Sequence, residues 1–214
     1  MCSPPLQWRT ERRAMNTNTP NTNSVIDRLE HDDLETRLDA LRGAVDADVE
    51  GIASRAYGDD VNNHVHTRYS FSPYSPSAVA FHARRAGLRV VGSVDHDSIG
   101  AAEEMHRAAE IVAMGATVGA EVRVSFRNTE FGDKRLNNPD TAGNAYIVLH
   151  GVPRLERPRL ADRLTAINGA REERNRLEVK KLNEIVGPVV GAIDYDRDVR
   201  SVSWAARGGS VTER

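Results

Sequence analysis

Histidine and carboxylate side chains are concentrated in three short motifs of this sequence. The first holds His64 and His66 in the stretch "NNHVHTRYS", in a chain with only 7 histidines among 214 residues. The second is "VDHD" at residues 94–97, and the third is "GAE", which ends at Glu121. Neutral imidazole and carboxylate groups together suit Zn, Mn or Fe. The three motifs therefore predict a site for divalent metal ions.

The pair His64 and His66 has two interpretations when it is considered alone. In an extended strand, residues i and i+2 point to the same side, about 7 Å apart along the strand. Both imidazoles would then project together and begin a metal site. The same spacing also fits a polar strand end without a ligand. The pair alone therefore does not predict a metal site, and the prediction depends on the other two motifs.

Each motif falls at the end of a predicted strand, and helices alternate with these strands. Strands are predicted at "NNHVHTRYS", "RVVGSV" and "ATVGAEVRVSF". Between them, "SPSAVAFHARRAGL" has Ser75 as a helix cap, Pro76 at the first helical position and Gly87 as the terminator. This alternation is typical of parallel βα units, whose strands present their carboxyl ends at one face. Side chains far apart in sequence are expected to meet there.

The rest of the chain divides into segments that differ in composition and in the spacing of their apolar residues. Residues 1–24 are rich in Pro, Asn, Thr and Ser and are predicted to be disordered. Residues 25–57 have apolar residues at helical spacing, with breaks expected at Gly43 and Gly51. Residues 58–214 form the predicted α/β domain. It includes a long polar loop at residues 127–143, a fourth strand at "NAYIVLHGVP" and a polar helix at about residues 157–185.

Composition excludes several classes of protein. The net charge of −2 gives no electrostatic footprint for nucleic acid. No apolar run approaches the roughly 18 residues that span a bilayer, and the first residues lack the apolar core of a signal peptide. The single cysteine, Cys2, cannot form an internal disulfide. We therefore expect a cytoplasmic protein with no membrane partner.

In order and spacing, "HVH", "VDHD" and "GAE" resemble the motifs of the PHP (polymerase and histidinol phosphatase) superfamily over about residues 61–126. The resemblance implies a TIM-like distorted (β/α)7 barrel of parallel strands with two or three divalent metal ions at the strand ends. It also implies hydrolysis of a small phosphomonoester or a nucleotide phosphodiester by metal-activated water. The metal ligands that it implies are His64, His66, His96 and Glu121, with a looser match at His150 in "YIVLHG".

Three other residues are candidates for roles near these ligands. On the family pattern, Asp95 would support the site or transfer protons, although it could equally cap the following helix. Arg68 and Arg123 lie near strand ends and could bind a phosphate by paired hydrogen bonds. Ion pairs with nearby acids would explain both arginines as well.

The sequence departs from the family pattern in three places. Asn62 and Asn63 stand where an acid usually precedes the first motif, and Phe71 stands where a carboxylate ligand is common. The closing D-x-H motif of the family has no counterpart. The final "GGSVTER" predicts a helix that begins at Ser210, one turn before the sequence ends. We therefore expect a fragment of a longer protein or a degraded copy of one.

Two alternatives to a phosphoesterase remain open. The missing ligands favour a non-catalytic metal-binding or interaction module, or an inactive fragment. An amidohydrolase-type C–N hydrolase also begins with H-x-H, but such enzymes typically place a bridging lysine at a strand end, and the sequence shows none there. The order of the motifs favours a phosphoesterase that acts on a small phosphorylated substrate or nucleotide.

Overall fold

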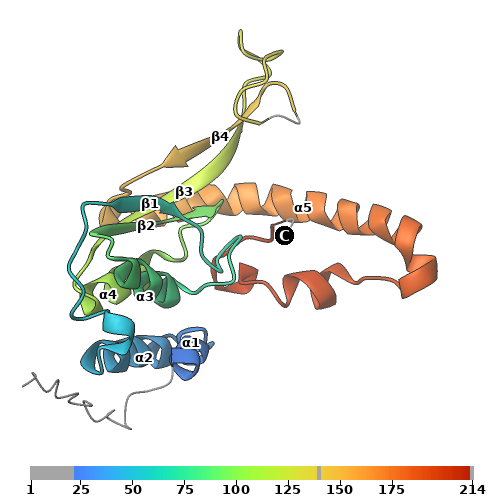
Figure 1. Ribbon diagram of the computed structural model, residues 1–214. Coiled ribbons are helices and arrows are strands. Elements are labelled where there is room, and N and C mark those ends of the chain that lie inside the picture. The colour runs from blue at the N-terminus through green and yellow to red at the C-terminus, as the bar shows by residue number, and fades with distance from the viewer. Residues whose placement is uncertain (1–21, 139–140, 213–214) are drawn as a thin grey trace, which may run out of the picture.

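The predicted alternation of strand and helix forms a mixed α/β fold around a four-stranded sheet (Figure 1). The computed structural model describes residues 22–138 and 141–212. In space the strands follow the order β1-β2-β3-β4. β1 pairs with β2 and β2 with β3 in parallel, as predicted. The strand bounds are β1 (Val61–Val65), β2 (Val90–His96), β3 (Gly115–Ser125) and β4 (Asn144–Leu149).

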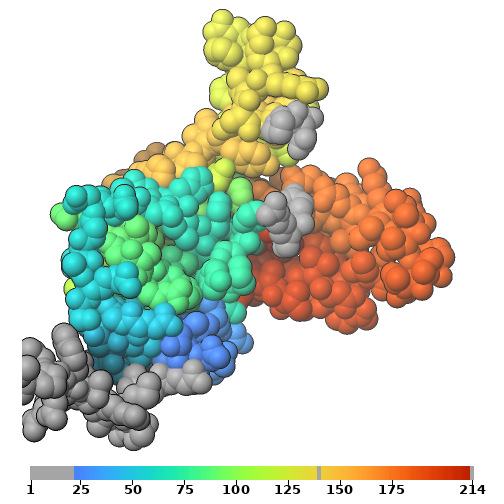
Figure 2. All heavy atoms as spheres, in the orientation of Figure 1, coloured from blue at the N-terminus to red at the C-terminus, as the bar shows by residue number. Residues whose placement is uncertain are grey.

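The fourth strand corrects the expectation of an entirely parallel sheet, because β4 runs antiparallel to β3. A parallel neighbour needs a crossover connection, usually a helix, that carries the chain back to the start of the sheet. Here β3 leads directly into the connection to β4, and the two ends of that connection pair, since Phe126 N donates to Gly143 O at 2.7 Å. The predicted polar loop is therefore the tip of a long hairpin. Its yellow atoms extend beyond the body of the molecule in Figure 2.

Helices α3 (Pro76–Ala86) and α4 (Ala102–Ile111) cover one face of the sheet. α3 begins and ends as predicted, since the Ser75 hydroxyl accepts from Ala78 N at 3.0 Å and Gly87 ends the helix at φ 84°. The residues of the "VDHDS" motif do not cap α4. That helix begins after Ala101, which makes no side-chain cap.

The N-terminal helices α1 (Thr22–Leu29) and α2 (Leu34–Asp46) pack on the outer side of α3 and α4 (Figure 1). Leu38 and Leu41 share a fully buried core with Phe81 and Met105. Arg37 forms a buried ion pair with Glu104, and its Nε lies 2.8 Å from Oε1. The region that we expected to precede the α/β domain is thus packed against it.

The helical region begins and breaks at other positions than predicted. α1 begins at Thr22, inside the segment 1–24 that was predicted to be disordered, and residues 1–21 lie outside the described residues. The break comes before Leu34, because the Asp33 carboxylate accepts from Thr36 N at 2.8 Å and caps α2. Gly43 lies within α2. A short 3-10 helix, Val49–Gly51, follows.

After β4, a 3-10 turn (Arg154–Glu156) leads into α5 (Arg157–Val190), the long polar helix that the sequence predicts. Leu164 of α5 packs against Val118 and Ala120 of β3. The chain then returns beside α5 through two short helices, Tyr195–Arg200 and Ala205–Arg207 (Figure 1). The helix predicted from Ser210 would extend beyond residue 212, outside the described residues. Among the helices of the described ranges, none is both long and apolar enough to cross a membrane.

Candidate metal centre

A bulge in β1 directs both histidines of the first motif toward the same side of the sheet. Asn62 pairs with Val91, whereas Val65 pairs with Ser93, so β1 holds one extra residue between these pairs. Asn62 and Val65 both line the groove beside α3. The extra residue therefore places His64 and His66 on the opposite side. Bulges of this kind re-aim side chains next to functional sites.

The register of β2 and β3 decides which members of the other two motifs join them. His96 lies beside Glu121, and Asp95 lies beside Ala120. Neighbours in a sheet point to the same side, and successive residues of a strand point to opposite sides. His96 and Glu121 therefore share one face, and the Asp95 side chain lies on the other.

Two glycines on that shared face let the edge strands curl over it. A Cβ at Gly92 of β2 would lie 2.6 Å from Asn63 O, and a Cβ at Gly119 of β3 would collide with Leu149 O. In a flat sheet, two strands three places apart would be about 14 Å from each other. The ring of His64, from β1, lies only 6.3 Å from the ring of His150, which follows β4, so the sheet is strongly curled.

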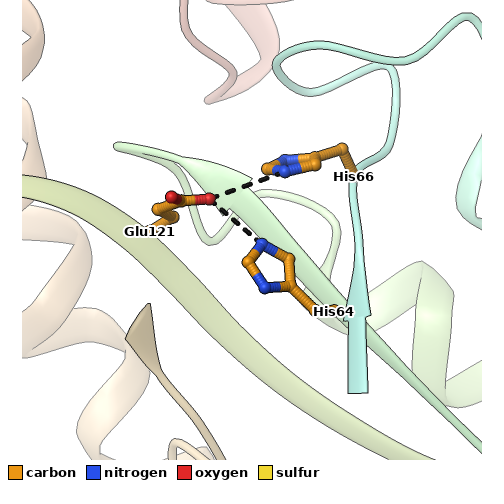
Figure 3. Close-up of side chains that lie close together, drawn as sticks. All are labelled: His64, His66 and Glu121. Atoms are coloured by element: carbon orange, nitrogen blue, oxygen red, sulfur yellow. Dashed lines mark hydrogen bonds and ion pairs between the residues drawn. The ribbon is translucent and has the colours of Figure 1, made fainter. Parts of the chain in front are cut away.

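The result is a cluster of three side chains around one carboxylate oxygen (Figure 3). Glu121 Oε2 lies 3.0 Å from His64 Nε2 and 3.5 Å from His66 Nε2. The three possible ligand atoms lie within 4.8 Å of one another. Two ligands at about 2.1 Å from a tetrahedral ion are separated by about 3.4 Å. The donor set and its spacing therefore fit a divalent metal ion.

The two remaining predicted histidines lie around this trio. His96 Nδ1 lies 4.0 Å from Glu121 Oε2, and its ring stacks on His66 with a centroid distance of 4.7 Å. His150 is exposed, and its ring contacts only the outer member, His64, among the three residues of the trio. The structure thus brings together all five predicted ligands, with three in direct contact and two beside them.

The electrostatic state of His66 suits metal binding. Burial, assisted by the nearby charges of His96 and His64, lowers the pKa of His66 to about 4, against the opposing effect of Glu121. The imidazole is therefore neutral near pH 7, which is the form that binds metals. Its Nδ1 is buried and has no hydrogen-bond partner among the described residues.

Asp95 is engaged on the other side of the sheet. Its carboxylate accepts from Thr67 N and Thr67 Oγ1, both at 2.7 Å, and from Ser70 Oγ at 2.6 Å. Burial raises the pKa of Asp95, although these hydrogen bonds act in the opposite direction. The contacts anchor the loop that follows His66. They favour a supporting role for Asp95, and proton transfer by this residue stays a prediction.

The two predicted phosphate-binding arginines lie in different surroundings. Arg68 donates to Glu30 O at 2.9 Å and stacks over the Trp204 ring at 4.0 Å, so the structure does not bring it to the trio. Arg123 is exposed on β3, two residues beyond Glu121 and on the same face by strand alternation. Substrate binding by either residue stays a prediction.

A cavity of about 260 Å³ opens beside the trio, and sequence reasoning missed most of its lining. Phe71 covers two of the predicted ligands, with its ring centroid 5.3 Å from that of His66 and 5.6 Å from that of His96. The Tyr146 ring, from β4, lies 5.9 Å from the His96 ring. The complete lining is Phe71, His96, Glu121, Tyr146, Arg171 and Thr212.

Comparison with known proteins gives partial likenesses in structure alone. No protein family matches the sequence, and no curated protein does. A provisionally assigned metal-dependent phosphoesterase from Bifidobacterium adolescentis is 18% identical, with a TM-score of 0.47 over 61% of this chain. An amidohydrolase from Chromobacterium violaceum, solved with bound sulfate and no metal, is 25% identical, with a TM-score of 0.48 over 64%. This chain covers 41% of each of these two structures.

Proposed function

We propose that this chain belongs to a metal-dependent hydrolase that cleaves phosphate esters. The observation that carries the proposal is the convergence of His64 and His66 on a single oxygen of Glu121. Two imidazoles and a carboxylate, with coordination positions left open, are typical of catalytic metal sites. The order of the three motifs supports a PHP-type barrel, to which the four curled strands would belong.

Each part of the site has a role in this proposal. His64, His66 and Glu121 would hold a divalent ion such as Zn, Mn or Fe, and His96 and His150 would complete that site or a second one. When bound, such an ion activates water and polarises a phosphoryl oxygen. Phe71 and Tyr146 exclude bulk water from one side of the cavity and restrict how an ester can enter it.

Two observations support a phosphate ester over a C–N bond as the substrate. The lysines of the sequence are Lys134, Lys180 and Lys181, which lie in the hairpin loop and in α5, away from the strand ends. A bridging lysine of the amidohydrolase type therefore has no candidate. In addition, the guanidinium-bearing Arg171 lines the cavity with His96 and Glu121, and its positive charge would favour an anionic phosphate ester there.

Metal binding without catalysis is the second candidate, and Phe71 is the observation that favours it. A phenyl ring lies against His66 and His96 where a further carboxylate would complete a multinuclear site. A chain that binds ions tightly without turnover would be a metal-binding module.

The test is hydrolysis of p-nitrophenyl phosphate and bis(p-nitrophenyl) phosphate by the chelator-treated protein, before and after addition of Zn, Mn or Fe. We expect turnover that depends on the added metal and is lost in Glu121→Ala. His31→Gln, an exposed histidine far from the trio in sequence, is the matched control and should keep the activity.

Metal binding is measured on the same samples so that the outcomes can be separated. Stoichiometric binding without turnover on either ester would support the module and overturn the hydrolase. Turnover that survives Glu121→Ala would overturn the proposed site itself.

A further inference from the structure

Helix α5 presents a polar stripe where a core-facing helix normally presents apolar residues. The stripe consists of Asn168, Arg171 and Asn175, which are spaced by three and four residues and so lie on one face of the helix. It continues the face of the buried Leu164, which lies four residues before Asn168. Arg171 is 8% exposed and Asn175 is 6% exposed. Buried polar groups require hydrogen-bond partners, so this face indicates a specific set of acceptors on the body of the protein.

Two of these side chains bind the same residue, Asp97, which directly follows His96. Arg171 donates through Nε to Asp97 Oδ2 at 2.8 Å, and its Nη2 contacts the same oxygen. Asn168 Nδ2 donates to Asp97 O at 2.8 Å. Helix α5 therefore holds Asp97 by both its side chain and its main chain.

Asp97 has a backbone conformation that needs such support. Its φ is +50°, in the left-handed region that costs free energy for residues with a Cβ, and the residue is 1% exposed. Strained residues of this kind persist where their surroundings hold them, and they are concentrated at functional sites. Asp97 N also donates to Glu121 O at 2.9 Å. The turn thus joins the main chains of two predicted ligands, His96 and Glu121.

We propose that Arg171 is a positioning residue of the metal centre, which acts through Asp97 on His96 and Glu121. The inference rests on the proposed function, because it takes His96 and Glu121 to be metal ligands. Helix α5, which lies outside the sheet, would then hold both ligands in their orientation. Arg171 borders the cavity beside both ligands. Loss of its bonds to Asp97 would release the strained turn and let the His96 ring leave the trio.

The experiment compares Arg171→Met and Arg171→Lys with the control Arg159→Met, all in the full chain. Arg159 lies on the same helix with a side chain that is 77% exposed. Two readouts are used: titration with Co²⁺, whose visible absorption reports on the ligand geometry, and the imidazole resonances of His96 in metal-free protein. Far-UV circular dichroism checks the fold of each variant.

We expect Arg171→Met to weaken Co²⁺ binding by about tenfold or more, as is usual for residues that orient metal ligands. Its Co²⁺ spectrum and its metal-free His96 resonances should both move. Arg171→Lys keeps the charge but loses the paired donors, so it should recover part of the wild-type spectrum. Arg159→Met should behave as the wild type does.

A folded Arg171→Met protein with wild-type Co²⁺ affinity and His96 resonances would overturn the proposal. If Arg171→Met does not fold, Arg171→Lys decides the question, because it keeps the positive charge but loses the paired donors to Asp97 Oδ2. Wild-type Co²⁺ affinity and His96 resonances in Arg171→Lys would then overturn the proposal. Failure of the wild type to bind Co²⁺ would instead contradict the proposed function, and the metal-free resonances would still test the role of Arg171.

Discussion

His64 and Glu121 are 57 positions apart and lie on strands separated by β2, yet His64 Nε2 lies 3.0 Å from Glu121 Oε2. The contact depends on the bulge in β1, which turns His64 inward, and on the curl of the sheet, which carries β1 over β2. The predicted metal site is therefore a product of strand geometry as much as of residue type.

We predict that His64→Gln and Glu121→Ala each weaken Zn²⁺ binding by at least about tenfold, because each removes a direct ligand of a three-residue site. Isothermal titration calorimetry on chelator-treated protein measures the effect. His31→Gln, with an exposed side chain, is the control and should bind Zn²⁺ as the wild type does. Equal affinities in all four proteins would contradict the ligand assignment.

Gly119→Ala should destabilise the protein and disturb the site, because the new methyl group would overlap Leu149 O. Overpacking of this kind typically costs about 1–3 kcal/mol. Gly43→Ala is the matched control, since nothing lies within 4 Å of its added Cβ inside α2. A helical alanine there should stabilise the protein by about 0.5–1 kcal/mol.

Urea unfolding of the two glycine variants measures both effects. Opposite signs are expected, destabilising at residue 119 and stabilising at residue 43. Two variants that shift the unfolding midpoint in the same direction would contradict the close approach of β4 to β3 at Gly119.

The sequence predicts the parts of this fold that depend on local patterns. Ser75, Pro76 and Gly87 define α3 through capping chemistry, and the motif histidines lie at the ends of β1 and β2 as expected. The direction of β4 could not be predicted, because "NAYIVL" has the same β propensity in either direction. Its direction depends on how residues 126–143 fold back, which is a tertiary property.

The candidate site also combines features that local sequence patterns predict with features that depend on the tertiary structure. The convergence of the candidate ligands could be predicted from residue type and spacing, but the two sides of β2 could not be assigned to Asp95 and His96 without the strand register. Arg171 was not among the predicted site residues, because candidates were sought at the ends of strands and Arg171 lies within a predicted helix. The signal for it was present in the spacing of Asn168, Arg171 and Asn175, which recur on one face of α5.

Asp95→Asn should destabilise the protein by about 1–3 kcal/mol. The two carboxylate oxygens of Asp95 accept three hydrogen bonds from Thr67 and Ser70, whereas an amide has a single accepting oxygen and places an NH2 group where the second oxygen was. Asp39→Asn is the control, since the Asp39 side chain is 63% exposed and pairs only with Arg42 among the ion pairs of the described residues. Denaturant unfolding compares them. Equal stability of both variants would remove the anchoring role that we assign to Asp95.

The surroundings of His82 lead us to expect that the free energy of unfolding depends on pH through a group that is separate from the metal site. Burial, followed by the charge of Arg85, lowers the pKa of His82 below its ordinary value of 6.5, against the effect of Glu50. The folded state therefore favours neutral His82, while the unfolded state binds a proton below pH 6.5. This contribution to stability is fully present above pH 6.5 and is lost as the pH falls toward the lowered pKa.

His82→Gln removes this titration, so its free energy of unfolding should fall less steeply than that of the wild type between about pH 7 and pH 5. Urea unfolding of both proteins in the presence of a chelator measures the two slopes without a contribution from bound metal. Because the aromatic contacts of His82 with Tyr74 and Phe81 are also lost, the variant should be less stable at pH 7. The difference between the two proteins should then narrow as the pH falls, and parallel curves would show that His82 does not titrate differently in the folded state.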